Sequence, residues 1–294
     1  MRDDGASFFA ALYRQILQRE AHPAEIAAQL RQHLRDDKVD YDGALRSALA
    51  SGEFRTRAFM TAAAHKMSAE LQLPRFREAA NFFSLGTHCA SSWFLKQSGL
   101  KQESGPFDWI FSSVAMVGYS IEDEFRSFLN RDDYVYVADE KRKGASHGYG
   151  SIGSYVKKFG MNVVFNHHDM RIDENYDYFV RCVNRFRAAI AGPRRVVLLL
   201  LGGQNAIRPD NFDRLAHIVA RKAENCFLFG IRSVPFEAAS DDCSAWRVLR
   251  SDRASELIEL KSYGRMGPLT FFNIVDQANL ARAFEQIMSK RMPG

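Results

Sequence analysis

One segment, RRVVLLLLGG at residues 194–203, constrains the folds open to this chain more than any other. Residues 196–201 within it are all apolar, so a strand formed there would present apolar side chains on both of its faces. Strands of this kind lie at the centre of sheets that are covered on both sides. The segment therefore predicts the buried central strand of a covered sheet.

Short apolar runs and helical patterns alternate along the chain on both sides of that segment. Further strands are predicted at residues 81–85, 134–137, 161–165, 226–231 and 269–274. Helices are predicted at residues 90–97, 120–129, 176–191, 210–224 and 277–289. This alternation is typical of layered α/β folds, so we predict one layered α/β domain over residues 80–294.

The N-terminal part has a different pattern. Its apolar residues, for example Phe8, Phe9 and Leu12, recur at helical spacing, and no strand pattern occurs among them. We predict three or four short helices that form a small all-α bundle over residues 1–66. The proline-containing segment 67–79 is predicted to be a linker. One role expected for the bundle is to dock a protein partner.

Charge and hydropathy exclude several classes of function. The formal net charge is +5, and the pI of about 9.0 comes without the basic stripe and interleaved aromatic residues of a nucleic-acid-binding protein. No apolar run approaches the ~18 residues of a membrane span, and the N-terminus lacks the residue order of a signal peptide. Glycine motifs for nucleotide phosphates are also absent. We therefore expect a cytoplasmic protein without a nucleic-acid partner.

The spacing of the cysteines argues against a metal site. The four cysteines, at positions 89, 182, 226 and 243, form no Cys-x-x-Cys pair, so we predict neither zinc nor a disulfide framework. Cys182, Cys226 and Cys243 lie within helical or strand patterns, where a cysteine packs as a small apolar residue. Cys89 differs, because it follows an apolar run and a glycine turn where a helical pattern begins.

This position gives Cys89 two interpretations. A thiol at a helix N-terminus feels the partial positive charge of unpaired backbone N–H groups, which lowers its pKa toward the reactive thiolate. Gly86 permits the turn, Thr87 is a candidate N-cap, and nearby backbone amides could hold an oxyanion. The alternative is a buried structural cysteine, and position alone does not decide between the two.

A thiol nucleophile needs a base and a group that orients the base. In VVFNHHD, His167 and His168 end a predicted strand, and only one of the two can face Cys89, because strand neighbours point to opposite faces. Asp108, in SGPFDWIFSS, could orient that histidine or could tie down its own turn. Asn205 ends the central strand and is a candidate polar contact in the same cleft.

These residues carry a resemblance to a bacterial family of putative papain-like cysteine peptidases, a domain of unknown function. The shared motifs are Ser-Leu-Gly-x-x-Cys at residues 84–89, Pro-Phe-Asp-Trp at 106–109 and His-Asp at 168–169. The resemblance implies that Cys89 is the nucleophile, that His168 is the base because it directly precedes Asp169, and that Asp108 supports the histidine. We also expect substrate contacts in this site, made by Gly86, His88, His167, Asp169 and Asn205.

Two further resemblances suggest a glycan context. The Gly-x-x-Cys turn is similar to that of a capsule-biosynthesis family with a Gly-Asn-Cys turn, thought to bind coenzyme A and to acylate sugars. The N-terminal segment resembles a small helical module often joined to bacterial glycosyltransferases. Its shared residues are Leu12, Tyr13, Arg14, Leu17 and Arg19, followed by Ser51, Glu53 and Phe54.

The sequence thus predicts a cysteine-dependent enzyme of acyl chemistry, either a papain-like hydrolase or an acyltransferase. Its substrate would be a small molecule, a peptide or a glycan, and no cofactor is expected apart from coenzyme A in an acyltransferase of polysaccharide biosynthesis. A non-catalytic binding or scaffolding protein is the third alternative. The separation of Cys89 from the nearer of the two adjacent histidines discriminates the first two from the third, since a dyad needs them within roughly 4 Å.

Overall fold

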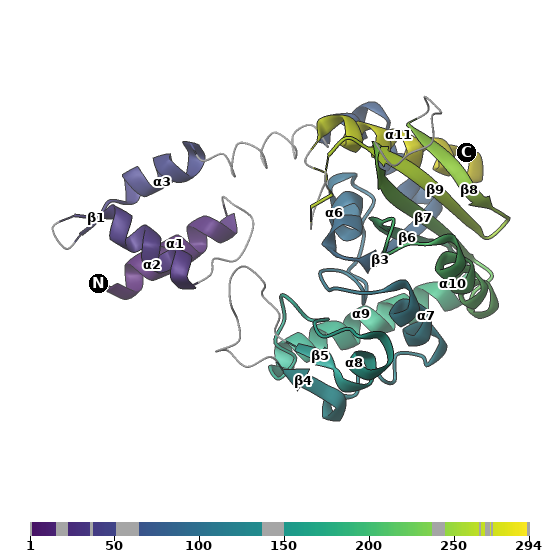
Figure 1. The fold of residues 1–294 in the computed structure, drawn as a ribbon, viewed down its shortest axis with the longest axis horizontal. Helices are drawn as coiled ribbons and strands as arrows, with labels where there is room; N and C mark the ends of the chain where they lie inside the picture. The colour runs from purple at the N-terminus through teal and green to yellow at the C-terminus, as the bar shows by residue number, and fades with distance from the viewer. Residues whose placement is uncertain are drawn as a thin grey trace. The chain divides into compact units, whose positions relative to one another are not determined.

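A computed structural model of the 294-residue chain provides the structure (Figure 1). The structure describes residues 2–15, 23–35, 38–50, 65–136, 150–236, 245–264, 266, 267, 271 and 273–292. The chain divides into two compact units, a helical unit over residues 1–63 and an α/β unit that begins at residue 64.

Within its described residues, the helical unit contains three helices and a short hairpin. The helices are α1 (Arg2–Gln15), α2 (Pro23–His33) and α3 (Tyr41–Ala50), and the hairpin strands are β1 (Leu34–Arg35) and β2 (Lys38–Val39). Phe9, Leu12 and Ala44 form its small core. The hairpin corrects the prediction of a bundle without strands, because strands of two residues are too short to show an alternating pattern.

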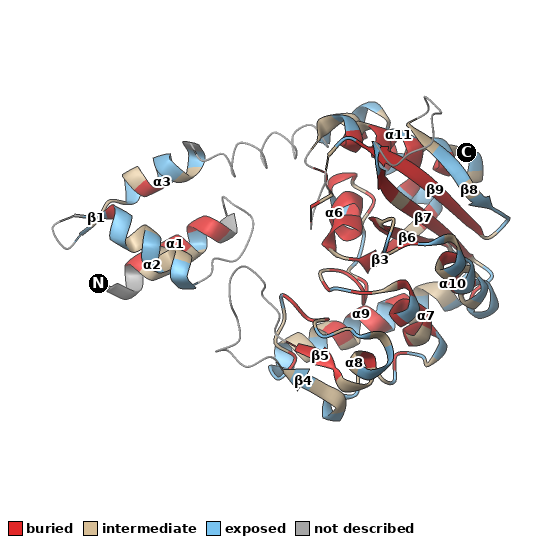
Figure 2. Cartoon of the chain, in the orientation of Figure 1, coloured by how far each residue is buried: buried red, intermediate tan, exposed pale blue. Residues whose placement is uncertain are grey.

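The α/β unit is built on a five-stranded sheet. Its strands are β3 (Ala80–Thr87), β6 (Arg195–Gly203), β7 (Cys226–Pro235), β9 (Ser255–Ser262) and β8 (Trp246–Ser251), in that spatial order. The first four run parallel, and β8 pairs antiparallel with β9 at the edge. The segment at 196–201 therefore lies inside the sheet as predicted, and Figure 2 shows β6 and its neighbours as buried.

Helices cover both faces of this sheet, as Figure 1 shows. On one face lie α6 (Cys89–Gln97) and α11 (Ile274–Arg291), and on the other lie α7 (Val114–Glu122), α9 (Asp173–Ala191) and α10 (Pro209–Lys222). Side chains alternate between the faces, so Leu198 packs in one core and Leu199 in the other. The predicted layered α/β fold is confirmed. None of the helices in the described ranges is long and apolar enough to cross a membrane.

Several predicted elements need correction. Residues 161–165 are not a strand. Phe165 alone forms an isolated bridge, with Gly150 of β5 (Gly150–Ile152), and β5 pairs with β4 (Tyr134–Tyr136). The helix predicted at 120–129 begins earlier as α7, because the Ser113 side chain caps it, and it ends at Glu122.

The predicted linker at 67–79 is structured. Residues 65–70 are helical, a 3-10 turn follows at Leu73–Arg75, and α5 occupies Phe76–Ala79. Leu73 and Phe76 are buried in the core between the sheet and helices α6 and α11. Their burial holds this segment against the rest of the α/β unit.

The C-terminal part holds the strands that sequence patterns missed. Strands β8 and β9 lie where no strand was predicted. Most of the strand predicted at 269–274 lies outside the described residues. Within it, Phe271 forms an isolated bridge with Met266, and α11 begins at Ile274.

Candidate active site

Cys89 is the first residue of α6, directly after the C-terminal end of β3. The N-cap of α6 is His88, whose Nδ1 accepts a hydrogen bond from the backbone N–H of Ala90 at 3.4 Å. The prediction of Thr87 as the cap was wrong, because Thr87 still pairs within β3. Cys89 thus lies at the carboxyl edge of a parallel sheet, where α/β folds place their sites.

Gly86 is required by the shape of this turn. Its φ of 95° lies in the region that side chains disfavour, and a Cβ atom there would lie 2.0 Å from Oγ of Ser112. Ser112 also donates its backbone N–H to the Thr87 carbonyl at 2.8 Å and its hydroxyl to the Leu85 carbonyl at 3.0 Å. The structure therefore shows Gly86 as a packing residue of the turn, and its expected substrate contact stays a prediction.

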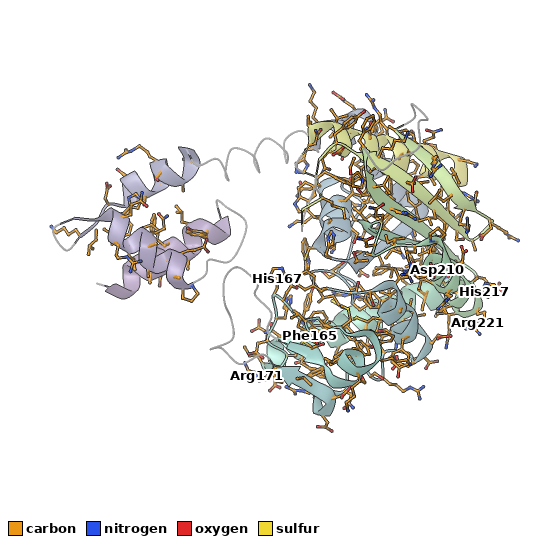
Figure 3. The ribbon with its side chains drawn as sticks, viewed as in Figure 1. Phe165, His167, Arg171, Asp210, His217 and Arg221 are labelled. Atoms are coloured by element: carbon orange, nitrogen blue, oxygen red, sulfur yellow. The ribbon has the colours of Figure 1, made fainter. Side chains whose placement is uncertain are left out.

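His167 is the histidine that lies beside the thiol. Its Nε2 atom is 3.8 Å from Sγ of Cys89, within the separation that a dyad requires. His167 is exposed and can be located in Figure 3, whereas Cys89 is only 2% exposed. The backbone N–H of Phe111 donates to the Val164 carbonyl at 3.0 Å. Residues 111 and 112 therefore contact both the turn before Cys89 and the segment before His167.

His168 points elsewhere. Its ring stacks on Tyr178 with centroids 5.1 Å apart and contacts Phe179 edge-on. Burial, and secondly the nearby His167, lowers the pKa of His168 to about 4, and its Nδ1 has no hydrogen-bond partner among the described residues. The expectation that His168 faces Cys89 is corrected by this geometry, because neighbouring side chains diverge and the one that faces the thiol is His167.

Asp108 does not contact either of these histidines. Its carboxylate forms an ion pair with Lys101 and accepts the backbone N–H of Gly105 at 2.8 Å. The side chain is 1% exposed, and burial raises the pKa of its carboxyl while Lys101 opposes that shift. Lys101 also donates to Ser92 of α6 at 2.5 Å. The alternative in which Asp108 ties down its own turn is the one that the geometry supports.

Asn166 is a member of the site that sequence reasoning missed. The residue is 7% exposed, and hydrogen bonding by its side chain lowers the pKa of the Cys89 thiol. Its Oδ1 atom has no hydrogen-bond partner within the described part of the chain. The available signal was a polar residue directly before the doubled histidine, in a segment already expected to reach the site.

The thiol of Cys89 is neutral in this arrangement. Burial raises its pKa to about 11, and the opposing hydrogen bonds from Asn166 and from its own backbone N–H are weaker. The charge of Asp108 raises the pKa further, and that of Lys101 lowers it. Desolvation therefore outweighs the lowering of the Cys89 pKa that was predicted from its position at a helix N-terminus.

The other expected substrate contacts are Asp169, Asn205 and His88. Asp169 forms a bidentate ion pair with Arg171, with Nη2 and Oδ2 2.5 Å apart, and Asn205 is exposed in the turn that follows β6. His88 is half-buried at the helix cap. Their roles toward a substrate stay predictions. Among the described residues, His, Cys, Asp and Glu form no group of three or more that could hold a metal ion.

Of the remaining cysteines, the structure describes Cys182 and Cys226. Cys182 and Cys226 are free thiols buried in the core, where desolvation raises their pKa values to about 11 and about 12. Cys243 lies outside the described residues.

Comparison with known proteins gives a match to a family. No curated protein and no solved structure matches the chain. One family does match, and the region it covers contains the strand, the turn and the helix that carry Cys89, together with Asp108, Asn166 and His167. Residues 80–222 of this chain match the model of the family described as "Putative papain-like cysteine peptidase (DUF1796)".

Proposed function

We propose that this protein is a thiol enzyme of acyl chemistry in which Cys89 is the nucleophile and His167 is the base. The observation that carries the proposal is the 3.8 Å separation of Sγ and Nε2 at the carboxyl edge of the sheet. A cysteine hydrolase is the activity that the family match supports at a coarse level. A thiol next to an imidazole is the minimal arrangement for covalent catalysis at cysteine.

The first step is attack of the thiol on a carbonyl carbon. Because burial keeps the thiol of Cys89 neutral, His167 takes its proton as the sulfur attacks. The amide of Asn166 already donates to Sγ, so it lies close to the oxyanion that forms on the attacked carbon. The backbone N–H of Cys89 is a second donor at the same point. His167 then returns the proton to the leaving group.

Asp108 acts on this site as a positioning residue. Its ion pair with Lys101, which also bonds to Ser92 one turn along α6, fixes the helix that carries Cys89. Asp108 was expected to orient the catalytic histidine. In this proposal it instead holds α6, the helix that carries Cys89, in place.

Acyl transfer is a second candidate, because the thiol is only 2% exposed. A site that excludes water protects a thioester from hydrolysis and favours its passage to an acceptor hydroxyl. In this version the donor is coenzyme A or another thioester, and the acceptor is a sugar of a bacterial polysaccharide. A cytoplasmic location and a protein partner for residues 1–66 remain parts of the same proposal.

Acylation by p-nitrophenyl acetate tests the proposal, since each acyl-enzyme formed releases one nitrophenolate. Wild-type protein should acylate at Cys89, and Cys89→Ser should abolish the release. His167→Ala should slow it by about 10²–10⁴-fold at neutral pH. His168→Phe and His217→Ala should change it little, because His168 faces Tyr178 and His217 is exposed on α10 (Figure 3). Acylation that survives Cys89→Ser would leave the non-catalytic alternative.

A further inference from the structure

The carboxamide of Asn166 lies beside the nucleophile and has a buried oxygen atom, Oδ1, without a hydrogen-bond partner among the described residues. Hydrogen bonding by the same side chain lowers the pKa of the Cys89 thiol. The side chain is 7% exposed. Buried polar atoms in native proteins are nearly always paired, so an unpaired acceptor next to a reactive thiol indicates a ligand that supplies the missing donor.

The shape of a carboxamide restricts that ligand. Asn166 presents an N–H donor and an oxygen acceptor side by side on one carbon. Both are satisfied together by a group that carries a carbonyl oxygen and an N–H on the same side, as a primary carboxamide does. A trans peptide bond directs its carbonyl and its N–H in opposite directions. An ester or a thioester has no N–H at all.

We propose that Asn166 recognises a primary carboxamide whose carbonyl carbon is the target of Cys89. This inference rests on the proposed function and names its substrate class. The substrate's carbonyl oxygen accepts the amide N–H that Asn166 gives to the thiol in the resting state, and the substrate –NH₂ group donates to Oδ1.

The reaction that follows is a deamidation. The thiol sulfur of Cys89 bonds to the carbonyl carbon, the carbon–nitrogen bond breaks, and the thiol proton passes through His167 to the leaving nitrogen, which departs as ammonia. Water then attacks the thioester and releases the carboxylic acid, and the sulfur regains a proton. The sum is one amide and one water consumed, with one acid and one ammonia formed. No oxidant or further reactant is needed.

Four small alkylating reagents test the recognition without knowledge of the natural substrate. They are 2-iodoacetamide, its N-methyl and N,N-dimethyl derivatives, and methyl iodoacetate, each with a carbonyl next to the carbon that Cys89 attacks. Alkylation of Cys89 is followed by mass spectrometry, and each rate constant is divided by that of glutathione. The primary amide should exceed the other three by about tenfold or more in these normalised rates. Asn166→Leu should remove the preference, and Asn162→Leu, at an exposed position in the same segment, should retain it.

The outcomes separate this inference from the proposed function. Equal normalised rates in the wild-type protein overturn the inference, whether or not Asn166→Leu folds. If those equal rates still fall in His167→Ala, the thiol–imidazole pair stands without carboxamide recognition. If the preference for the primary amide persists but His167→Ala changes no rate, recognition stands and the proposed function fails. A Cys89 that reacts with none of the four reagents overturns both.

Discussion

Acidification should destabilise the α/β unit through His168. Burial lowers the pKa of His168 from 6.5 to about 4, so between these values the unfolded chain binds a proton that the folded chain does not. The free energy of unfolding therefore falls as the pH drops from about 6.5 to about 4. The full shift corresponds to about 3 kcal/mol at ~1.4 kcal/mol per pH unit, and partial exposure of the ring reduces this to about 2 kcal/mol.

The substitution His168→Phe isolates this contribution, because phenylalanine keeps an aromatic ring on Tyr178 and does not titrate. Urea unfolding followed by tryptophan fluorescence measures it in the correct unit, since all three tryptophans, at positions 93, 109 and 246, lie in the α/β unit. Between pH 7 and pH 4, the wild-type protein should lose about 2 kcal/mol more stability than His168→Phe.

The same experiment can refute the reasoning. If the stability difference between wild type and His168→Phe is the same at pH 7 and pH 4, His168 is not held neutral by the fold. His217→Phe, at an exposed position on α10, should follow the pH dependence of the wild type and thus controls for the loss of a histidine. An NMR titration of His168 should independently give a midpoint near 4.

Two further substitutions test the scaffold of the site. Gly86→Ala should lower the free energy of unfolding by about 2 kcal/mol or more, because its Cβ would overlap Oγ of Ser112. Gly203→Ala, where a Cβ has no atom within 4 Å, is the control, and equal urea midpoints for the two variants would contradict the prediction. Lys101→Met should cost about 3–5 kcal/mol by leaving the carboxylate of Asp108 buried without its cation. Lys101→Met combined with Asp108→Leu should cost less than Lys101→Met alone, and strictly additive losses would rule out the coupling.

Patterns of apolar residues predicted strands β3, β6 and β7 of the sheet but missed β9 and β8. Strands β3, β6 and β7 are apolar along most of their length, and the sequence placed all three. Strand β9 is as deeply buried, yet its sequence SELIELKS is rich in charged residues. Its glutamates tolerate burial because Arg291 pairs with Glu256 at 2.5 Å and Arg247 pairs with Glu259 at 2.7 Å. Those arginines lie on other elements, so no local pattern of residues 255–262 could reveal them.

Some features of the candidate site could also be predicted from the sequence, and others could not. The turn at Cys89 was predicted because the glycine, the cysteine and the start of the helix are neighbours in the sequence. The choice between the two histidines was not, since it depends on the bridge that fixes Phe165 against Gly150. The burial of Asn166 likewise arises from contacts between segments, so its position before the doubled histidine marked it only as a polar residue of a segment expected at the site.

The hydrogen bonds of residues 111 and 112 have a consequence for how such a site can vary. Phe111 binds the Val164 carbonyl and Ser112 binds the Thr87 carbonyl, each through its backbone N–H. These two consecutive backbone amides connect the turn before Cys89 to the segment before His167. The connection at position 111 uses only backbone atoms, so it needs no particular side chain there. Loops elsewhere between the two segments are then free to change in length and composition. A chain built this way can acquire new substrate-facing loops while the sulfur and the imidazole keep their spacing.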